Sequence, residues 1–238
     1  MPLTQLLPRS LRTRATVFTW VVLVLGMSAL SLYVSNSLQT DMQRLVGEQQ
    51  QSVVTALAKN IQDDLTQRLR ALDAVAKQMD TQLLRDPTAL HNQVEQRPLL
   101  QLLFNGGVWV TDSSGTAIAD VPRSSQRIGN SFKDQDFLAA TLTEGKWMVG
   151  KPTTDAQLKA PVVNLSVPVR DAAGKVIGAV VGVTRLQTDS FLDVSTQGNY
   201  GKTGGFLLIA PQHQMVVTAT DARRNLQPSP GPGVNTMH

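Results

Sequence analysis

Residues 160–183 read APVVNLSVPVRDAAGKVIGAVVGV, and this stretch decides the fold. Apolar and polar side chains alternate in its first half, as they do along an extended chain with two different faces. One face carries Val163, Leu165 and Val167, and the other carries Asn164, Ser166 and Pro168. The alternation predicts a half-buried strand over residues 161–169, whose polar face lines a pocket or meets water. The run Asp171-Ala172-Ala173-Gly174 has turn chemistry and joins this strand to a second one over 176–186.

Strand patterns also occur upstream of this pair. Residues 108–111 and 116–119 are strand-like, and Asp112-Ser113-Ser114-Gly115 between them has the chemistry of a hairpin turn. A loop over 122–130, a helix over 133–142 and a strand over 146–149 follow. This order predicts a five-stranded antiparallel sheet with flanking helices, which is an α+β domain of PAS-like type.

Between Asn36 and Leu84 the sequence has the rhythm of one long helix. Apolar residues recur every three or four positions and form a single stripe. The stripe consists of Val54, Leu57, Ile61, Leu65, Leu69, Leu72, Ala76, Met79 and Leu83. It packs on its own domain, on the same helix of a second chain, or on both. Its spacing drifts from a strict coiled-coil repeat, which favours packing at least partly on its own domain. Asp86-Pro87 ends this helix, and a second helix over 88–104 is interrupted by Pro98.

The first part of the chain is a candidate membrane anchor. Residues 15–34 read ATVFTWVVLVLGMSALSLYV and contain no charge, which is enough helix to cross about 30 Å of hydrocarbon. Arg9, Arg12 and Arg14 precede it, and this asymmetry predicts a cytoplasmic N-terminus. The alternative is a cleaved signal peptide, but its apolar core is usually shorter and ends at a small-residue cleavage site. We therefore expect an uncleaved single-pass anchor.

A second unit is predicted to start near Gly198. A glycine-rich entry at 200–205 precedes two strand-like runs, 206–210 and 214–220, which form another hairpin. The tail over 221–238 is polar and rich in proline. Two strands do not make a stable domain alone, so the chain is either truncated or the pair docks on the first domain.

The composition excludes several classes of function. There is no cysteine, which excludes disulfides, thiol catalysis and cysteine metal sites. The net charge is +4 and no long basic run follows the first arginines, so no nucleic-acid footprint is present. His91, His213 and His238 lack metal-ligand spacing, and we find no nucleophile-elbow, dinucleotide or phosphate-loop motif. We expect neither a catalytic site nor a cofactor nor a metal.

Four stretches resemble the double-Cache sensor region of bacterial receptors. They read GGVWVTDSSGTAIADVP, IGNSFKDQDFLAATLTEGKWMVGKPTT, APVVNLSVPVRDAAGKVIGAVVGV and GKTGGFLLIAPQHQMVVTATD. The sequence of the last stretch is most similar to the corresponding stretch of receptors whose output is a GGDEF-type diguanylate cyclase. The resemblance covers the membrane-distal lobe and only the first hairpin of the membrane-proximal lobe, which implies a C-terminal truncation. A cytoplasmic cyclase, kinase or chemotaxis output would then lie outside these 238 residues.

The resemblance and the patterns together predict five parts. These are a cytoplasmic N-terminus over 1–14, a transmembrane helix over 15–35, a stalk helix over 36–85, a membrane-distal Cache lobe over 86–190 and a partial membrane-proximal lobe over 198–238. The chain is expected in the bacterial inner membrane with its sensor domain in the periplasm or outside the cell. Expected partners are a small molecule, the lipid bilayer and a second copy bound through the stalk helix.

The family binds small ligands, often amino acids or carboxylates, between the helix after the first hairpin and the concave sheet. Asp134 keeps the family's aspartate, but Gln135 stands where arginine is usual, Asp136 takes a variable position and Phe137 stands at the tyrosine. A glutamine offers one neutral amide in place of a two-pronged cationic clamp, which argues against a carboxylate held in that manner. Lys133, Lys146 or Lys151 would be the substitutes as point charges.

We expect the ligand site among nine residues: Trp109, Asp120, Asp134, Gln135, Asp136, Phe137, Trp147, Lys151 and Asn164. For the aromatic residues the alternative is core packing, and for the aspartates it is a helix cap or a surface position. Asn164 faces either a pocket or water, and Lys151 either a ligand or solvent.

Two readings of function from different classes follow. The first is a binding module in which an extracytoplasmic ligand reshapes the distal pocket and the long helix passes the change to the membrane. The second is a membrane-tethered dimerisation or interaction fragment that binds no ligand. A membrane-anchored hydrolase is a third reading without a motif to support it.

Overall fold

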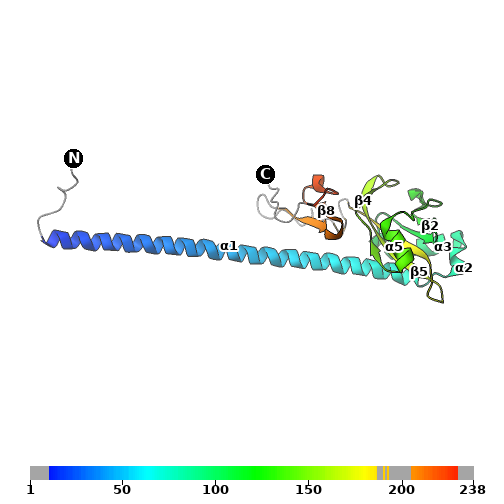
Figure 1. Cartoon of the computed structure of the whole chain (residues 1–238), viewed down its shortest axis with the longest axis horizontal. Coiled ribbons are helices and arrows are strands. Elements are labelled where there is room, and N and C mark those ends of the chain that lie inside the picture. The colour runs from blue at the N-terminus through cyan, green and yellow to red at the C-terminus, as the bar shows by residue number, and fades with distance from the viewer. Residues whose placement is uncertain (1–10, 187–189, 191, 193–204, 230–238) are drawn as a thin grey trace. The chain divides into compact units, whose positions relative to one another are not determined.

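The computed structural model of the protein describes residues 11–186, 190, 192 and 205–229, with backbone alone for 11–14, 36–50 and 124 (Figure 1). The chain divides into two compact units, residues 1–59 and 60–238. Most of the glycine-rich entry, the boundary predicted near Gly198 and the last nine residues of the proline-rich tail lie outside the described residues.

The first helix, α1 (Leu11–Ala76), contains the candidate anchor. Its segment Ala15–Ser35 has a mean hydropathy of 2.1 and is not buried by other parts of the chain. The hydroxyl of Thr19 donates a hydrogen bond of 2.9 Å to the carbonyl of Ala15, so this polar side chain is satisfied within the helix. Among the described residues, this is the one helix long and apolar enough to cross a membrane.

Helix α1 ends at Ala76, earlier than the predicted end at Leu84. The amides of Gln78 and Met79 turn back to the carbonyls of Val75 and Ala76, which closes the last turn. Met79 is buried, and Asp80 then starts a new short helix, α2 (Thr81–Leu84), by accepting a hydrogen bond from the amide of Leu83. The buried apolar side chains therefore continue past the end of α1, although the helix itself does not.

Two proline-started helices follow, where the sequence predicts one interrupted helix. They are α3 (Pro87–Glu95) and α4 (Pro98–Leu103). Asp86 caps α3 by accepting hydrogen bonds from the amides of Thr88 and Ala89. Each proline stands in the first turn of its helix, where its missing N–H costs nothing.

The sheet is antiparallel and has six strands, one more than predicted. Its order is β2-β1-β6-β5-β3, and β4 also pairs with β5. The missed strand β4 is a short polar segment with no alternation to reveal it. The strands are β1 (Val108–Asp112), β2 (Ala117–Val121), β3 (Met148–Val149), β4 (Thr153–Asp155), β5 (Ala160–Arg170) and β6 (Val176–Arg185).

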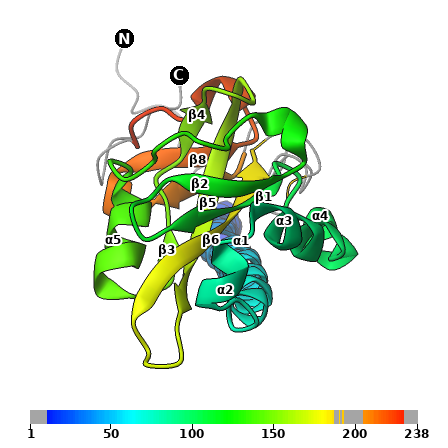
Figure 2. The same cartoon turned by 90° about the vertical axis from the view of Figure 1, so that its right-hand side faces the viewer.

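Helices cover both sides of this sheet (Figure 2). Helix α5 (Asp136–Glu144) packs on β5 and β6, while the region of α1, α3 and α4 lies on the other side. Strand β5 is consequently buried on both faces, so the prediction of a half-buried strand is wrong. Ser166 is fully buried, and its hydroxyl is satisfied there by that of Thr141 on α5, 2.6 Å away.

A second, two-stranded sheet lies near the C-terminus, as the sequence predicts. It pairs β7 (Leu207–Ala210) with β8 (Met215–Ala219) through the short 3-10 turn η4 (Pro211–His213). After another 3-10 turn, η5 (Ala222–Arg224), the chain returns to pair by backbone hydrogen bonds with Val216.

Candidate ligand-binding site

A cavity of about 420 Å³ lies on the face of the sheet that α5 covers. Strands β1 and β5 contribute one residue each, and the remaining walls come from the segment between β2 and α5 and from β4 with its following turn. The lining residues are Trp109, Asn164, Arg127, Asn130, Ser131, Phe132, Gln135, Thr153, Thr154, Asp155, Ala156 and Gln157. This is a polar cavity with an aromatic wall, which is the usual composition of a small-molecule site.

The aromatic wall is built by Trp109 and Phe132. Their ring centroids lie 4.5 Å apart and their planes are tilted by 47°. Trp109 belongs to a core cluster with Phe137, Leu138 and Val181, so the indole is fixed by packing. Its Nε1–H is buried and has no hydrogen-bond partner. A buried donor without a partner costs about 1–3 kcal/mol, which a bound molecule or water can recover.

A matching acceptor comes from β5. Asn164 pairs through its backbone with Val183 of β6, and its side chain is only 5% exposed. Its Oδ1 atom is buried and also has no partner. Trp109 and Asn164 lie on the same face of the sheet, because Trp109 pairs with Val181 and Asn164 pairs with Val183, two residues along β6. Both residues line the cavity, and each carries a buried polar atom without a partner, one a donor and the other an acceptor.

The charges at the cavity are already paired. Arg127 is 1% exposed, and its guanidinium donates to Asp120 Oδ1 at 3.0 Å and to the carbonyl of Gly106 at 3.2 Å. The second carboxyl oxygen of Asp120 accepts the backbone amide of Arg127 at 3.1 Å. Asp155 Oδ2 lies 3.6 Å from the same guanidinium. Such a buried pair is stable only with its hydrogen bonds complete, so Arg127 has little left to offer a ligand.

Three of the predicted site residues line this cavity: Trp109, Gln135 and Asn164. Gln135 precedes α5 and makes no side-chain capping bond there. Asp120 is fully buried beside the cavity as the partner of Arg127.

The other five predicted residues do not line it. Phe137 is a core residue, and Asp134, Asp136 and Lys151 are exposed. Trp147 is 41% exposed, and its Nε1–H donates to Asp73 of α1 at 3.3 Å. The structure thus places these residues in the core or on the surface, as the alternatives to ligand binding in the sequence analysis describe.

Sequence reasoning missed the residues contributed by the loop and by β4. The most important is Arg127, and one signal pointed to it. Asp120 lies in the apolar strand run Ala117–Val121, and a carboxylate buried in such a strand needs a cationic partner. Arginines 123 and 127 are the nearest candidates in the sequence. Phe132 and Asp155 carried no comparable signal.

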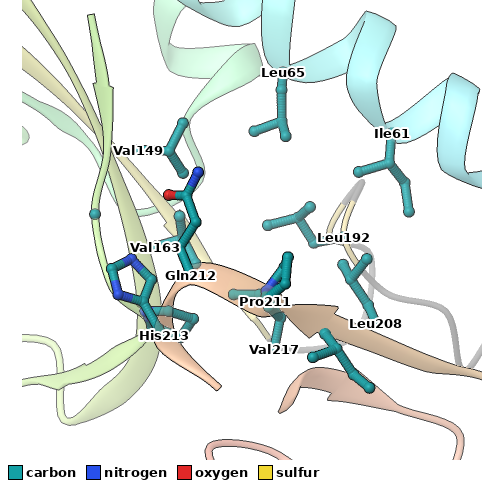
Figure 3. A pocket seen from close by; sticks show the side chains of 14 residues that line it. Ile61, Leu65, Val149, Val163, Leu192, Leu208, Pro211, Gln212, His213 and Val217 are labelled. Atoms are coloured by element: carbon teal, nitrogen blue, oxygen red, sulfur yellow. The ribbon is translucent and has the colours of Figure 1, made fainter. Parts of the chain in front are cut away.

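A second, smaller cavity of about 180 Å³ has a different character. Aliphatic side chains surround it, among them Ile61 and Leu65 of α1 and Leu208 and Val217 of the second sheet (Figure 3). Gln212 and His213 are the polar members of its lining. Among the described lining residues, none has a buried polar side-chain atom without a partner. Its mainly aliphatic lining suits an apolar group better than a polar one.

Comparison with known proteins identifies the class. The family model dCache_1, described as a Cache domain, matches residues 38–230. The chain therefore belongs to the Cache domain family. No curated protein matches it by sequence.

Several solved structures with a similar fold are ligand-binding domains of chemoreceptors. The ligand-binding domain of the amino-acid chemoreceptor PctC of Pseudomonas aeruginosa, in complex with GABA, is 24% identical with a TM-score of 0.57; the match covers 73% of this chain and 76% of that one. The domain of the Pseudomonas fluorescens chemoreceptor CtaA with L-serine is 20% identical with a TM-score of 0.58, covering 73% and 71%. PctB of P. aeruginosa with L-Gln is 21% identical with a TM-score of 0.56, covering 72% and 67%. At this identity the likeness establishes the fold.

Proposed function

We propose that this chain is the extracytoplasmic small-molecule-sensing region of a membrane signal-transduction receptor. The observation that carries the proposal is the cavity beside α5, whose wall holds the buried, unpartnered Nε1–H of Trp109 and Oδ1 of Asn164. Native proteins rarely leave such groups unsatisfied, and a site that recognises a ligand is one reason to do so. The chemoreceptor domains that share this fold were solved with small ligands bound, which supports the same role here.

The membrane attachment is part of the proposal. The segment Ala15–Ser35 would span the bacterial inner membrane once, with the arginine-rich N-terminus in the cytoplasm and the Cache domain outside it. The output would be a cytoplasmic diguanylate cyclase or kinase carried by a part of the receptor outside these 238 residues. A ligand would change that output by binding one conformation of the sensor better than the other.

We further propose that the receptor is a homodimer through the stalk part of α1. Val53 and Val54 in this helix are 49% and 53% exposed, so their apolar surface is not used within the chain. The same observation favours the second candidate function, a membrane-tethered dimerisation fragment that binds no ligand. The two differ in whether the cavity has a ligand.

A ligand screen separates these candidates. The full chain in detergent would be heated in the presence of amino acids, carboxylates, polyamines and nucleobases. A ligand at about one hundred times its Kd stabilises the folded state by about 2.7 kcal/mol, which raises Tm by several degrees. The rise should vanish in Asn164→Leu and remain in Asp136→Ala, an exposed position. A folded protein with no response to any of these classes would favour the dimerisation fragment.

A further inference from the structure

The charges around the polar cavity restrict its ligand, provided that the cavity is the sensing site proposed above. Arg127 is the one cation among the described lining residues, and it faces two carboxylates, those of Asp120 and Asp155. Lys133 and Lys151 are exposed outside the lining, and Lys146 pairs with Glu144 at 2.9 Å. A carboxylate ligand would therefore enter a site with no unshared positive charge and would lose its hydration without a cation to compensate for it.

The unpartnered atoms restrict the ligand from the other side. The indole Nε1–H of Trp109 requires an acceptor, and the Oδ1 of Asn164 requires a donor. A simple ammonium ion carries donors only and would leave Trp109 unsatisfied. Gln135, which also lines the cavity, adds one neutral amide that can both donate and accept. The complementary ligand therefore carries both a donor and an acceptor but no ionised carboxylate.

The aromatic wall supplies the shape. Trp109 and Phe132 contribute two packed aromatic rings to the lining of a cavity of about 420 Å³, which is within the range of small-molecule sites. A flat conjugated ring gains more from such a wall than a short aliphatic chain does. We infer that the ligand is an uncharged, planar molecule with an N–H beside a carbonyl, of the nucleobase or cyclic-amide class, rather than a zwitterionic amino acid.

The test compares matched probes on the full chain in detergent by calorimetry. Uracil, hypoxanthine and nicotinamide represent the neutral class without ionised groups, whereas the zwitterions L-serine and GABA and the dication putrescine represent the ionised classes. We expect binding by at least one neutral probe. Trp109→Phe keeps the aromatic wall and removes the N–H, so it should weaken that binding about tenfold, while Asp136→Asn leaves it unchanged.

Each other outcome overturns a different statement. Binding of L-serine, GABA or putrescine alone would overturn the neutral-ligand inference and leave the sensor function standing. If a neutral probe binds with the same affinity to Trp109→Phe, Asn164→Leu and the unchanged protein, the ligand does not bind in this cavity, and the assignment of the class to it is overturned. Binding of no probe by a folded protein would overturn the inference together with the proposed sensor function.

A gain of function provides a second measurement. Gln135→Arg adds an unshared cation to the cavity wall at an exposed position, where it should not disturb folding. If charge is what excludes carboxylates, this variant should bind GABA or L-serine at least tenfold more tightly than the unchanged protein. Equal binding by the two proteins would contradict the role given to charge.

Discussion

The two faces of the six-stranded sheet differ in what they bury. On the side of α1, α3 and α4, β5 and β6 present Val163, Leu165 and Val180, and the buried surface is mainly apolar, with the hydroxyl of Thr184 as a buried polar group. On the side of α5, the same strands and their neighbours bury polar groups as well as apolar ones. Some of these polar groups are paired, as Ser166 is with Thr141, and others are not, as with Asn164. The first face therefore contributes mainly stability, and the second exchanges some stability for recognition.

The largest effect is expected where a polar group of the second face has a buried partner. Asp120→Ala would leave the guanidinium of Arg127 buried without its carboxylate, at a cost of about 3–5 kcal/mol in the free energy of unfolding. Urea denaturation measures this loss. The double variant Asp120→Leu/Arg127→Met should recover part of it, because both charges of this pair are removed together while Asp155 loses its cation. If the double variant is as unstable as the single one, the pair is not the cause.

The apolar face should respond nearly as strongly. Leu165 is completely buried, and Leu165→Ala should lower the free energy of unfolding by about 2–5 kcal/mol through lost burial and a residual cavity. Leu102, which is 81% exposed, is the matched control, and Leu102→Ala should change stability by less than about 0.5 kcal/mol. If the two variants lose similar amounts of unfolding free energy, burial on this face is not a main source of stability.

A smaller loss is expected from crowding the same face. A Cβ added at Gly182 would lie 2.4 Å from Cε1 of Phe104, whose ring is 1% exposed. Gly182→Ala should therefore cost about 1–3 kcal/mol, because the ring must move. Combining it with Phe104→Leu tests the cause: the cost of Gly182→Ala should shrink in that background, whereas strictly additive costs would place the strain elsewhere.

The smallest effect on stability should have the opposite sign. Asn164→Leu removes an unpartnered buried acceptor, so the free energy of unfolding should stay the same or rise by about 1 kcal/mol. The same variant should lose the response to ligand. A clear loss of stability would show that Asn164 has a structural partner, and the contrast between the two faces would then be weaker.

Much of the fold could be predicted from the sequence because its cues are local. Alternation along 161–169 and the turn at Asp171 specify the β5–β6 pair, and the helix predicted to follow Asp86-Pro87 begins there as α3. The break in α1 at Ala76 could not be predicted, since the apolar stripe runs on through Met79. The short polar strand β4 owes its existence to pairing with β5, a contact between segments that no local pattern encodes.

Apart from Gln135, which the resemblance supplied, the site could be predicted where a strand pattern placed a side chain on the face that α5 covers. That condition holds for Trp109 and Asn164, which alternate with core residues. It fails for Trp147, whose indole bonds to Asp73 on a helix far away in the sequence. It fails equally for Arg127, because a loop has no period from which the direction of a side chain follows.

The unpartnered indole of Trp109 also makes the protein its own optical probe. The emission of a tryptophan depends on what its N–H and ring touch, and this one lies in the wall of the cavity. The other two tryptophans are Trp20, in the candidate membrane segment, and Trp147, on the surface. With both replaced by phenylalanine, the remaining tryptophan fluorescence would come from the cavity wall alone, and occupancy could be followed in real time without a label.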